Sequence, residues 1–420
     1  MPNSARQSLR LCWTPCGADR MSSDAGNAGA RSQIPRTVWA LGLVSLLMDL
    51  SSETIHALLP LFLTTTLGVS VAMVGLIDGI AEATASITKV FSGYISDRMG
   101  RRKPLILLGY GLGAISKPLF ALAGSAPVVL GARFADRIGK GLRGAPRDAL
   151  VADVTPDAIR GRAFGLRQSL DTVGAFAGPL LAIALMAAFA GDMRLVFWVA
   201  VVPAGLAVLC VIFGVEDQGD SEQPKPSRSP ITLADLKQFE RPFWGVVALG
   251  VVFTLARFSE AFLILKASAE GLPLTFTPAV LVVMNVVYAL GAYPAGIASD
   301  RFPARILLGV GLTCLIMADL VLALVSGLAG AFVGIALWGL HMALTQGLMA
   351  KLVADRAPRE LRGSAFGLFN LATGATMLAA SVLAGVLWDQ FGMSTTFAVG
   401  AAFATAAFSL LLLGTRTPKP

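Results

Sequence analysis

Charged side chains are scarce in this chain. Aspartate, glutamate, lysine and arginine make up 14% of the 420 residues, whereas a soluble protein carries roughly 25%. Hydrophobic residues make up 55%, and the mean hydropathy is +0.71. The apolar residues come in runs near the length of about 20 residues that crosses a bilayer. This composition argues against an isolated soluble domain and predicts an all-α polytopic membrane protein embedded in the lipid bilayer.

Histidines and catalytic motifs are also scarce. The sequence holds only two widely separated histidines, so the H-E-x-x-H motif of zinc proteases is absent, as is a G-x-S-x-G elbow. Gly139 and Lys140 resemble part of a phosphate-binding P-loop, but Phe134 replaces its first glycine and Gly141 its serine or threonine. We therefore expect no enzyme activity, no metal site, no cofactor and no ATP-driven transport.

Twelve apolar segments have the length of membrane helices. They cover residues 38–66, 70–95, 104–124, 126–153, 162–189, 194–214, 242–266, 274–298, 304–326, 330–355, 362–388 and 393–414. We expect five regions: a disordered N-terminal tail (1–36), a six-helix bundle (37–214), a polar linker (215–241), a second six-helix bundle (242–415) and a C-terminal tail (416–420). Whether translation starts at Met1 or Met21 stays open.

Lysine and arginine are distributed unevenly over the loops. Fifteen of them lie on connections that join even to odd helices, and the opposite connections carry only Arg194 and Lys266. By the positive-inside rule the fifteen face the cytoplasm. Both termini are then cytoplasmic, and we expect the chain in the inner (cytoplasmic) membrane. The net charge of +8 thus reflects topology and does not indicate a nucleic-acid partner.

The sequence contains an internal repeat. A charged loop between two apolar runs occurs at 93–103 and again at 296–305. A second pair of segments, 150–166 and 352–368, is identical at 11 of 17 positions with an offset of 202 residues. The charged loop recurs after 203 residues, nearly the same offset, and this agreement, together with the even number of helices between copies, predicts two parallel six-helix repeats.

The first charged loop carries the motif by which the chain resembles a known family. Residues 93–103 fit G-x-x-x-D-R-x-G-R-R/K, the cytoplasmic loop motif of the major facilitator superfamily, and the resemblance extends from about residue 38 to the end. In the second copy Pro303 replaces the second glycine. The resemblance implies a secondary transporter with two repeats around a central cavity, and we expect it to act as a monomer. In that family this loop closes the cytoplasmic side, which assigns a conformational gate to Gly93, Asp97, Arg98, Gly100, Arg101, Arg102, Asp300 and Arg301.

Helix 5 carries a second resemblance. Gly165, Gly174 and Gly178-Pro179 have the spacing of a motif found in the drug/proton antiporters of the superfamily, although Ala182-Ile183 stands where that motif ends in two glycines. An alternative is that these small residues only let helices pack closely. The first interpretation implies an exporter, and the second implies nothing about direction.

Ionisable residues inside the predicted helices are the best candidates for chemistry. A charge at the bilayer centre costs at least about 2.5–3.5 kcal/mol, so such residues should face a watery cavity or one another. Spacings of three, four and seven place those of helices 1 and 2 on one face each. The candidates for proton coupling and the substrate cavity are Asp49, Glu53, His56, Asp78, Glu82, Lys89, Arg133, Asp136, Arg137, Lys140, Arg257 and Glu260.

Two interpretations of these residues compete. They could form buried salt bridges that hold helices together, with acids of helices 1 and 2 meeting bases of helix 4. They could instead form a proton relay, because burial and a nearby cation shift a carboxyl in opposite directions. For proton work we favour Glu53 or Asp49, then Glu82, with Arg133 or Arg137 as the modulating cation.

The sequence therefore predicts a proton-coupled transporter that moves a small molecule by alternating access, with efflux as the favoured direction. Proton symport that imports an anionic metabolite is the main alternative, since helix 4 is rich in cations. A membrane sensor without transport activity is the alternative of another class. The complete gate motif argues against a sensor, and coupling chemistry is expected in the N-terminal half.

Overall fold

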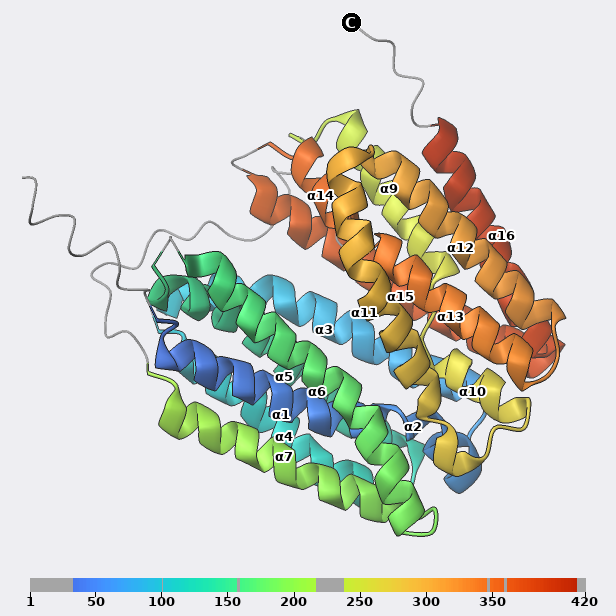
Figure 1. The fold of residues 1–420 in the computed structure, drawn as a ribbon, viewed down its shortest axis with the longest axis horizontal. Coiled ribbons are helices and arrows are strands. Elements are labelled where there is room, and N and C mark those ends of the chain that lie inside the picture. The colour runs from blue at the N-terminus through green and yellow to red at the C-terminus, as the bar shows by residue number, and fades with distance from the viewer. Residues whose placement is uncertain are drawn as a thin grey trace, which may run out of the picture.

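The computed structural model describes residues 33–99, 101–156, 159–216, 238–345, 348–358 and 361–413, and every regular element within them is a helix. The predicted all-helical architecture is thus confirmed (Figure 1). Most of the predicted tails and linker, and the gate residue Gly100, lie outside the described residues.

The first bundle contains six membrane helices. They are α1 (Arg36–His56) continued by α2 (Leu59–Leu61) and the π-helical η1 (Phe62–Thr66), then α3 (Val71–Met99), α4 (Lys103–Leu122), α5 (Ala126–Val154), α6 (Arg160–Ala188) and α7 (Met193–Gly214). The α6–α7 turn uses Gly191 at φ 87°, and the carboxylate of Asp192 then caps α7 by accepting hydrogen bonds from the backbone of Arg194 and Leu195.

The second bundle repeats this order. It contains α9 (Arg241–Ala256) with α10 (Ala261–Ala269), the 3₁₀ turn η3 (Leu274–Phe276) with α11 (Ala279–Arg301), α12 (Ala304–Leu324), α13 (Leu328–Thr345) with α14 (Leu348–Arg356), α15 (Arg362–Phe391) and α16 (Met393–Leu413). Eleven of the helices in the described chain are long and apolar enough to cross a membrane. The twelfth crossing is α5, whose 29 residues carry many charges.

The first helix of each bundle is interrupted, contrary to the prediction of continuous segments at 38–66 and 242–266. In the first bundle the α-helix stops at His56, because Pro60 offers no N–H to the carbonyl of residue 56 and its ring clashes there. In the second bundle residues 257–260 leave the helix, and the Ser259 hydroxyl accepts a hydrogen bond from Ala261 N at 3.1 Å to start α10. The two breaks lie about one repeat offset apart.

Matching contacts at one end of the molecule relate the two bundles. We call this the basic end, where α3 ends and α4 begins. There Lys103 Nζ donates to the carbonyl of Ile212 at 2.9 Å, and Arg305 Nη2 donates to the carbonyl of Leu412 at 3.0 Å. Each contact ties the start of a third helix to the end of a sixth, as expected for parallel repeats.

The bundles join at the other end, which we call the opposite end (Figure 1). One apolar core there includes residues of both bundles, such as Phe62 and Phe262. Toward the basic end the apolar cores belong to one bundle each, with Leu41 in one and Phe243 in another. The bundles are therefore closed together at the opposite end, and among the described residues they share no apolar core at the basic end.

Helices α3 and α15 make the closest contact between the bundles. Gly75 and Gly79 of α3 lie directly against the backbone of Ser381 and Leu378 of α15, where a side chain would collide. At the opposite end the Asp389 carboxylate of α15 accepts hydrogen bonds from the backbone of Val71 and Ala72 at 3.1 and 2.8 Å. A carboxylate at a helix N-terminus is favourable, so α15 caps α3 across the bundle boundary.

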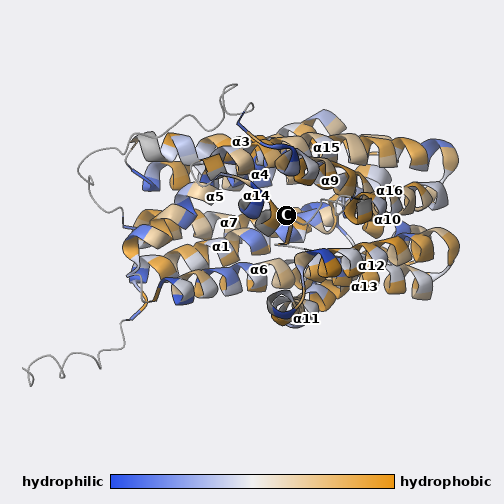
Figure 2. Ribbon diagram, turned by 90° about the horizontal axis from the view of Figure 1, so that it is seen from above, coloured by the Kyte–Doolittle hydropathy of each residue, from blue (hydrophilic) through white to orange (hydrophobic). Residues whose placement is uncertain are grey.

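The outer surface is apolar. Hydrophobic residues run along most of the length of the helices (Figure 2), and Phe213, Leu324 and Leu290 are 82%, 76% and 73% exposed. So many large exposed apolar side chains are compatible with a folded chain when lipid replaces water around it.

Candidate functional site

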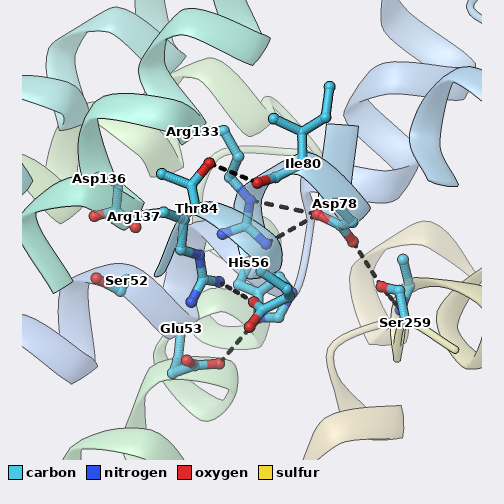
Figure 3. A network of polar contacts seen from close by, with 12 residues as sticks. Ser52, Glu53, His56, Asp78, Ile80, Thr84, Arg133, Asp136, Arg137 and Ser259 are labelled. Atoms are coloured by element: carbon cyan, nitrogen blue, oxygen red, sulfur yellow. Dashed lines mark hydrogen bonds and ion pairs between the residues drawn. The ribbon is translucent and has the colours of Figure 1, made fainter. Parts of the chain in front are cut away.

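A buried ion pair of the first bundle lies beside the boundary between the two bundles. Asp78 of α3 accepts hydrogen bonds from Arg133 of α5, with Nη2 at 2.9 Å, and from the Ser259 hydroxyl at 2.8 Å (Figure 3). Ser259 lies in the break of the seventh membrane helix and also accepts from Ala261 N. Asp78 therefore links an arginine of the first bundle to the irregular backbone of the second.

A second pair lies one turn further along the same two helices. Arg137 Nη2 is 3.2 Å from Glu82 Oε1. The Glu82 side chain is 42% exposed and that of Arg137 only 6%. Glu82 is therefore the carboxylate of this network that solvent reaches, while its partner stays buried behind it.

The acids of the first membrane helix have different kinds of partner from those of the second. Glu53 contacts His56 at 3.4 Å just before the helix stops (Figure 3), and Asp49 faces Asp171 of α6. The structure thus brings the acids of helix 2 together with the bases of helix 4. The acids of helix 1 pair with a histidine and with another acid.

A cavity of about 260 Å³ lies beside this network. Its lining combines Glu82 of the first bundle with Arg257 of the second and several hydroxyl and apolar groups. It is lined by Glu82, Ser86, Gly250, Phe253, Thr254, Arg257, Thr345, Met349, Phe369, Thr373, Gly374 and Met377. All of these lie at or on the basic-end side of the helix-7 break, so the cavity extends from the break toward the basic end. A mostly apolar pocket with a few convergent polar groups is typical of a small-molecule site.

Lys117 and Asp319 are two buried ionisable residues that our candidate set omitted. Lys117 of α4 is 1% exposed and donates to Asp136 of α5 at 2.7 Å and to Ser52 at 2.9 Å. Asp319 of α12 is fully buried. The signal that finds both is the one used for the other candidates, a charge within an apolar run, and the two positions are separated by the repeat offset of 202 residues.

A further network lies in the first bundle near the basic end. Arg147 of α5 donates to Ser45 at 2.9 Å and lies 3.6 Å from Asp171, which Arg167 also approaches at 3.9 Å. The Arg143 guanidinium lies 4.6 Å from the centre of the Tyr110 ring. These cations fix α5 against its neighbours.

The remaining predicted site residues lie outside these contacts. Lys89 and Lys140 are exposed and form no ion pair among the described residues. Arg257 and Glu260 do not share a helical turn, because they flank the break before α10. In the gate, Arg102 binds Asp153 at 3.1 Å and the Ser96 hydroxyl at 2.9 Å, and Arg301 is exposed. The side chains of Asp97, Arg98 and Asp300 lie outside the described set.

The helix 5 motif places small residues against the first helix. Gly174 lies against the Leu46 carbonyl, and a side chain at Gly178 would come within 2.7 Å of Glu53 Cβ. Gly165 has open space beside it. Two of the three glycines therefore allow α6 to approach the segment that carries Glu53.

Two six-helix bundles with a mostly apolar cavity beside their boundary, lined by a few polar groups, define a transporter fold of the alternating-access type. The family model of the Major Facilitator Superfamily matches residues 41–287 and 271–420. The chain therefore belongs to the major facilitator superfamily, a family of membrane transporters and not of enzymes.

Individual relatives agree with this membership. The chain is 30% identical to an uncharacterized MFS-type transporter of Methanocaldococcus jannaschii, over 90% of this chain and 95% of that one. It is 29% identical to a probable 4-methylmuconolactone transporter of Cupriavidus pinatubonensis, over 92% and 91% of the two chains. Among solved structures, the nucleoside transporter NupG superposes with a TM-score of 0.77 at 12% identity, over 90% of this chain and 100% of that chain. That last likeness concerns the fold alone.

Proposed function

We propose that this protein is a proton-coupled antiporter that exports a small molecule across the inner membrane by alternating access. One observation carries the proposal. Glu82 borders the cavity opposite Arg257, and its carboxylate is paired with the buried Arg137. A carboxylate in this position can bind either a proton or a cationic group. The proton and the substrate would therefore compete for the Glu82 carboxylate.

The charge of the loops supports an orientation. If the basic end faces the cytoplasm, as the positive-inside rule suggests, both termini are cytoplasmic and the cavity extends toward the cytoplasm. The shared apolar core then seals the outside. The structure would thus be the inward-facing state of the cycle. The conversion to the outward-facing state would involve Glu53, Asp49, Arg133 and the Arg102–Asp153 contact.

The step that couples proton to substrate follows from the pairing of Glu82. When Glu82 takes a proton, the buried Arg137 loses its partner and an unpaired buried cation becomes costly. Closing the cytoplasmic side then requires a new arrangement of the network, which includes Asp78 and Ser259 of opposite bundles. The proton thereby biases an equilibrium between two arrangements of the bundles.

Proton symport of an anionic small molecule is the second candidate. Arg257 in the cavity wall favours it, because a guanidinium is a suitable partner for a carboxylate or phosphate. One relative carries the name of a probable 4-methylmuconolactone transporter, which supports a small organic substrate for this candidate. The two candidates predict opposite directions of transport under the same gradient.

Transport in everted membrane vesicles separates these candidates. Vesicles containing the chain would be given a panel of small molecules under an imposed pH gradient, acidic inside. An exporter accumulates its substrate in these everted vesicles and loses that accumulation when the gradient is dissipated, whereas a symporter accumulates it only when the gradient is reversed so that the vesicle exterior is acidic. Exchange that continues at an unchanged rate without any response to the gradient would contradict proton coupling.

A further inference from the structure

Asp319 is a carboxyl group without a partner in the interior of the second bundle. It is 0% exposed, and both of its oxygens lack a hydrogen-bond partner within the described chain. Its surroundings are apolar. Gly400 of α16 leaves room for it, because a side chain there would come within 2.8 Å of Asp319 Oδ2 and 3.0 Å of the Phe258 ring. Phe258 itself lies in the break of the seventh helix.

The equivalent position of the first bundle contains a paired charge. One repeat offset earlier stands Lys117, whose partner is Asp136 at 2.7 Å. The residue one offset after Asp136 is Trp338, which is fully buried and whose indole N–H also lacks a hydrogen-bond partner among the described residues. An ion pair in one bundle is thus replaced in the other by an unpaired acceptor and an unpaired donor.

The charged residues of the neighbouring helices do not supply a counter-charge for the Asp319 carboxyl group. Over Met393–Leu413, α16 has no ionisable residue, and α13 has only His341, which bonds the Gly311 carbonyl at 2.8 Å. On the seventh helix, Arg257 lines the cavity and Lys266 binds Glu270. On α11, Tyr288 packs against the apolar core that includes Ala318, and the charged residues of α11 and α14 lie near the basic end. Arg257 and Glu260 flank the break, and neither oxygen of Asp319 has a hydrogen-bond partner in the described chain.

An ionised carboxylate without any hydrogen bond or counter-charge is strongly disfavoured in such a place. We propose that Asp319 is a second proton-binding site, which holds its proton in this conformation and releases it when the helix-7 break moves. On release the O–H bond of the carboxyl breaks and the proton passes to water admitted at the opposite end. The indole N–H of Trp338 is then available to donate to the carboxylate. The proposal rests on the alternating-access function and adds an acid of the second bundle that was not among the candidates from the sequence.

Infrared spectroscopy of the full-length protein tests whether the proton is there. The spectrum of the wild type at neutral pH should contain the C=O stretch of a neutral carboxyl that Asp319→Asn removes. Asp192→Asn is the matched control, because Asp192 caps α7 as a carboxylate and asparagine is an equally good cap. If wild type and Asp319→Asn have the same neutral-carboxyl absorption, the proposal is wrong.

A distance measurement tests whether the proton is linked to the conformation. Spin labels at Thr66 and Phe391, exposed positions at the opposite end of the two bundles, report its opening in proteoliposomes. Raising the pH should lengthen this distance in the wild type, and Asp319→Asn should hold it at the low-pH value at every pH. The proposal would be overturned if the distance in the wild type did not change with pH, or if the distance in Asp319→Asn changed with pH as it does in the wild type. Both readouts need no substrate, so they succeed or fail independently of the vesicle assay.

Discussion

Lys117 and Asp136 form a buried ion pair, and we expect its role to be structural. Both side chains are almost fully buried, at 1% and 6% exposure. Removing one member leaves the other as an uncompensated buried charge, which costs about 3–5 kcal/mol. We therefore expect Lys117→Met to destabilise the protein by about that amount, measured as the free energy of unfolding by denaturant.

The double variant is the control for this prediction. Replacing both partners, in Lys117→Met with Asp136→Leu, should restore most of the lost stability, because an apolar pair of similar volume needs no counter-charge. A single variant as stable as the wild type would show that the pair contributes nothing.

The site could be predicted from the sequence in part. Charges within apolar runs identified Asp78, Glu82, Arg133 and Arg137, because a charge in a membrane helix is costly unless a partner or a watery cavity offsets that cost. Which acid meets which base was not predictable, since the relative rotation of two helices depends on packing between them. The partnership of Asp78 with Ser259 was missed for the same reason, as a serine in an apolar run carries no signal of its own.

At the scale of the helix, the glycines of α6 determine where the first membrane helix lies. We expect Gly178→Val to displace α1 at Glu53 and to lower stability by about 1–3 kcal/mol, the typical cost of overpacking. Thermal unfolding of the purified protein measures this.

Gly165→Val is the control within the same helix and motif, because it has open space beside it. It should change stability little. If Gly165→Val destabilises the protein as much as Gly178→Val, close packing does not explain the motif.

The loop after α10 should respond to pH. Glu270 accepts hydrogen bonds from Lys266 and from the backbone of Gly327, and the bond from Lys266 is the main reason that the pKa of Glu270 lies below its usual value. A lowered pKa in the folded state means that this contact stabilises the loop above the ordinary glutamate pKa and is lost as the pH falls through the folded value. Amide exchange at Gly327, corrected for intrinsic rates, should accelerate in acid in the wild type. In Glu270→Gln the corrected rate should stay constant with pH, and a wild-type rate that is equally constant would contradict the assignment.

Helix existence was predictable and helix continuity was not. Eleven of the twelve segments were visible as apolar runs, because spanning a bilayer fixes their length and composition, and the segment at 126–153 was predicted despite its many charges. The first break has a visible cause in Pro60. The break at 257–260 contains neither proline nor glycine, and it is stabilised by Ser259, whose hydrogen bonds reach a helix of the other bundle.

At the scale of the whole molecule, Asp389 acts as a latch between the bundles. Its carboxylate caps α3 across the boundary, and loss of a helix cap costs about 0.5–2 kcal/mol. Because these bonds form only when the opposite end is closed, Asp389→Ala should shift the equilibrium toward the state open at that end. The distribution of distances between labels at Thr66 and Phe391 should gain a longer component. An unchanged distribution would mean that the cap has no part in closure.

The arrangement of the bundles relative to each other lies beyond what this sequence predicts. The repeat revealed two equivalent bundles and the loops suggested an orientation. Which end is closed depends on a small free-energy difference between two packings of the same helices, here settled by contacts such as Gly75 against Ser381.

Transport by Glu82→Gln tests the central claim of this account most directly. Glutamine keeps the shape of the protonated side chain but cannot release a proton. In proteoliposomes containing a substrate found by the vesicle screen, we predict that the variant loses accumulation driven by a pH gradient and retains exchange of substrate across the membrane. Glu53→Gln, measured beside it, shows whether the acid of the first helix shares this role. Accumulation by Glu82→Gln at the wild-type rate, with the same dependence on the gradient, would contradict the account.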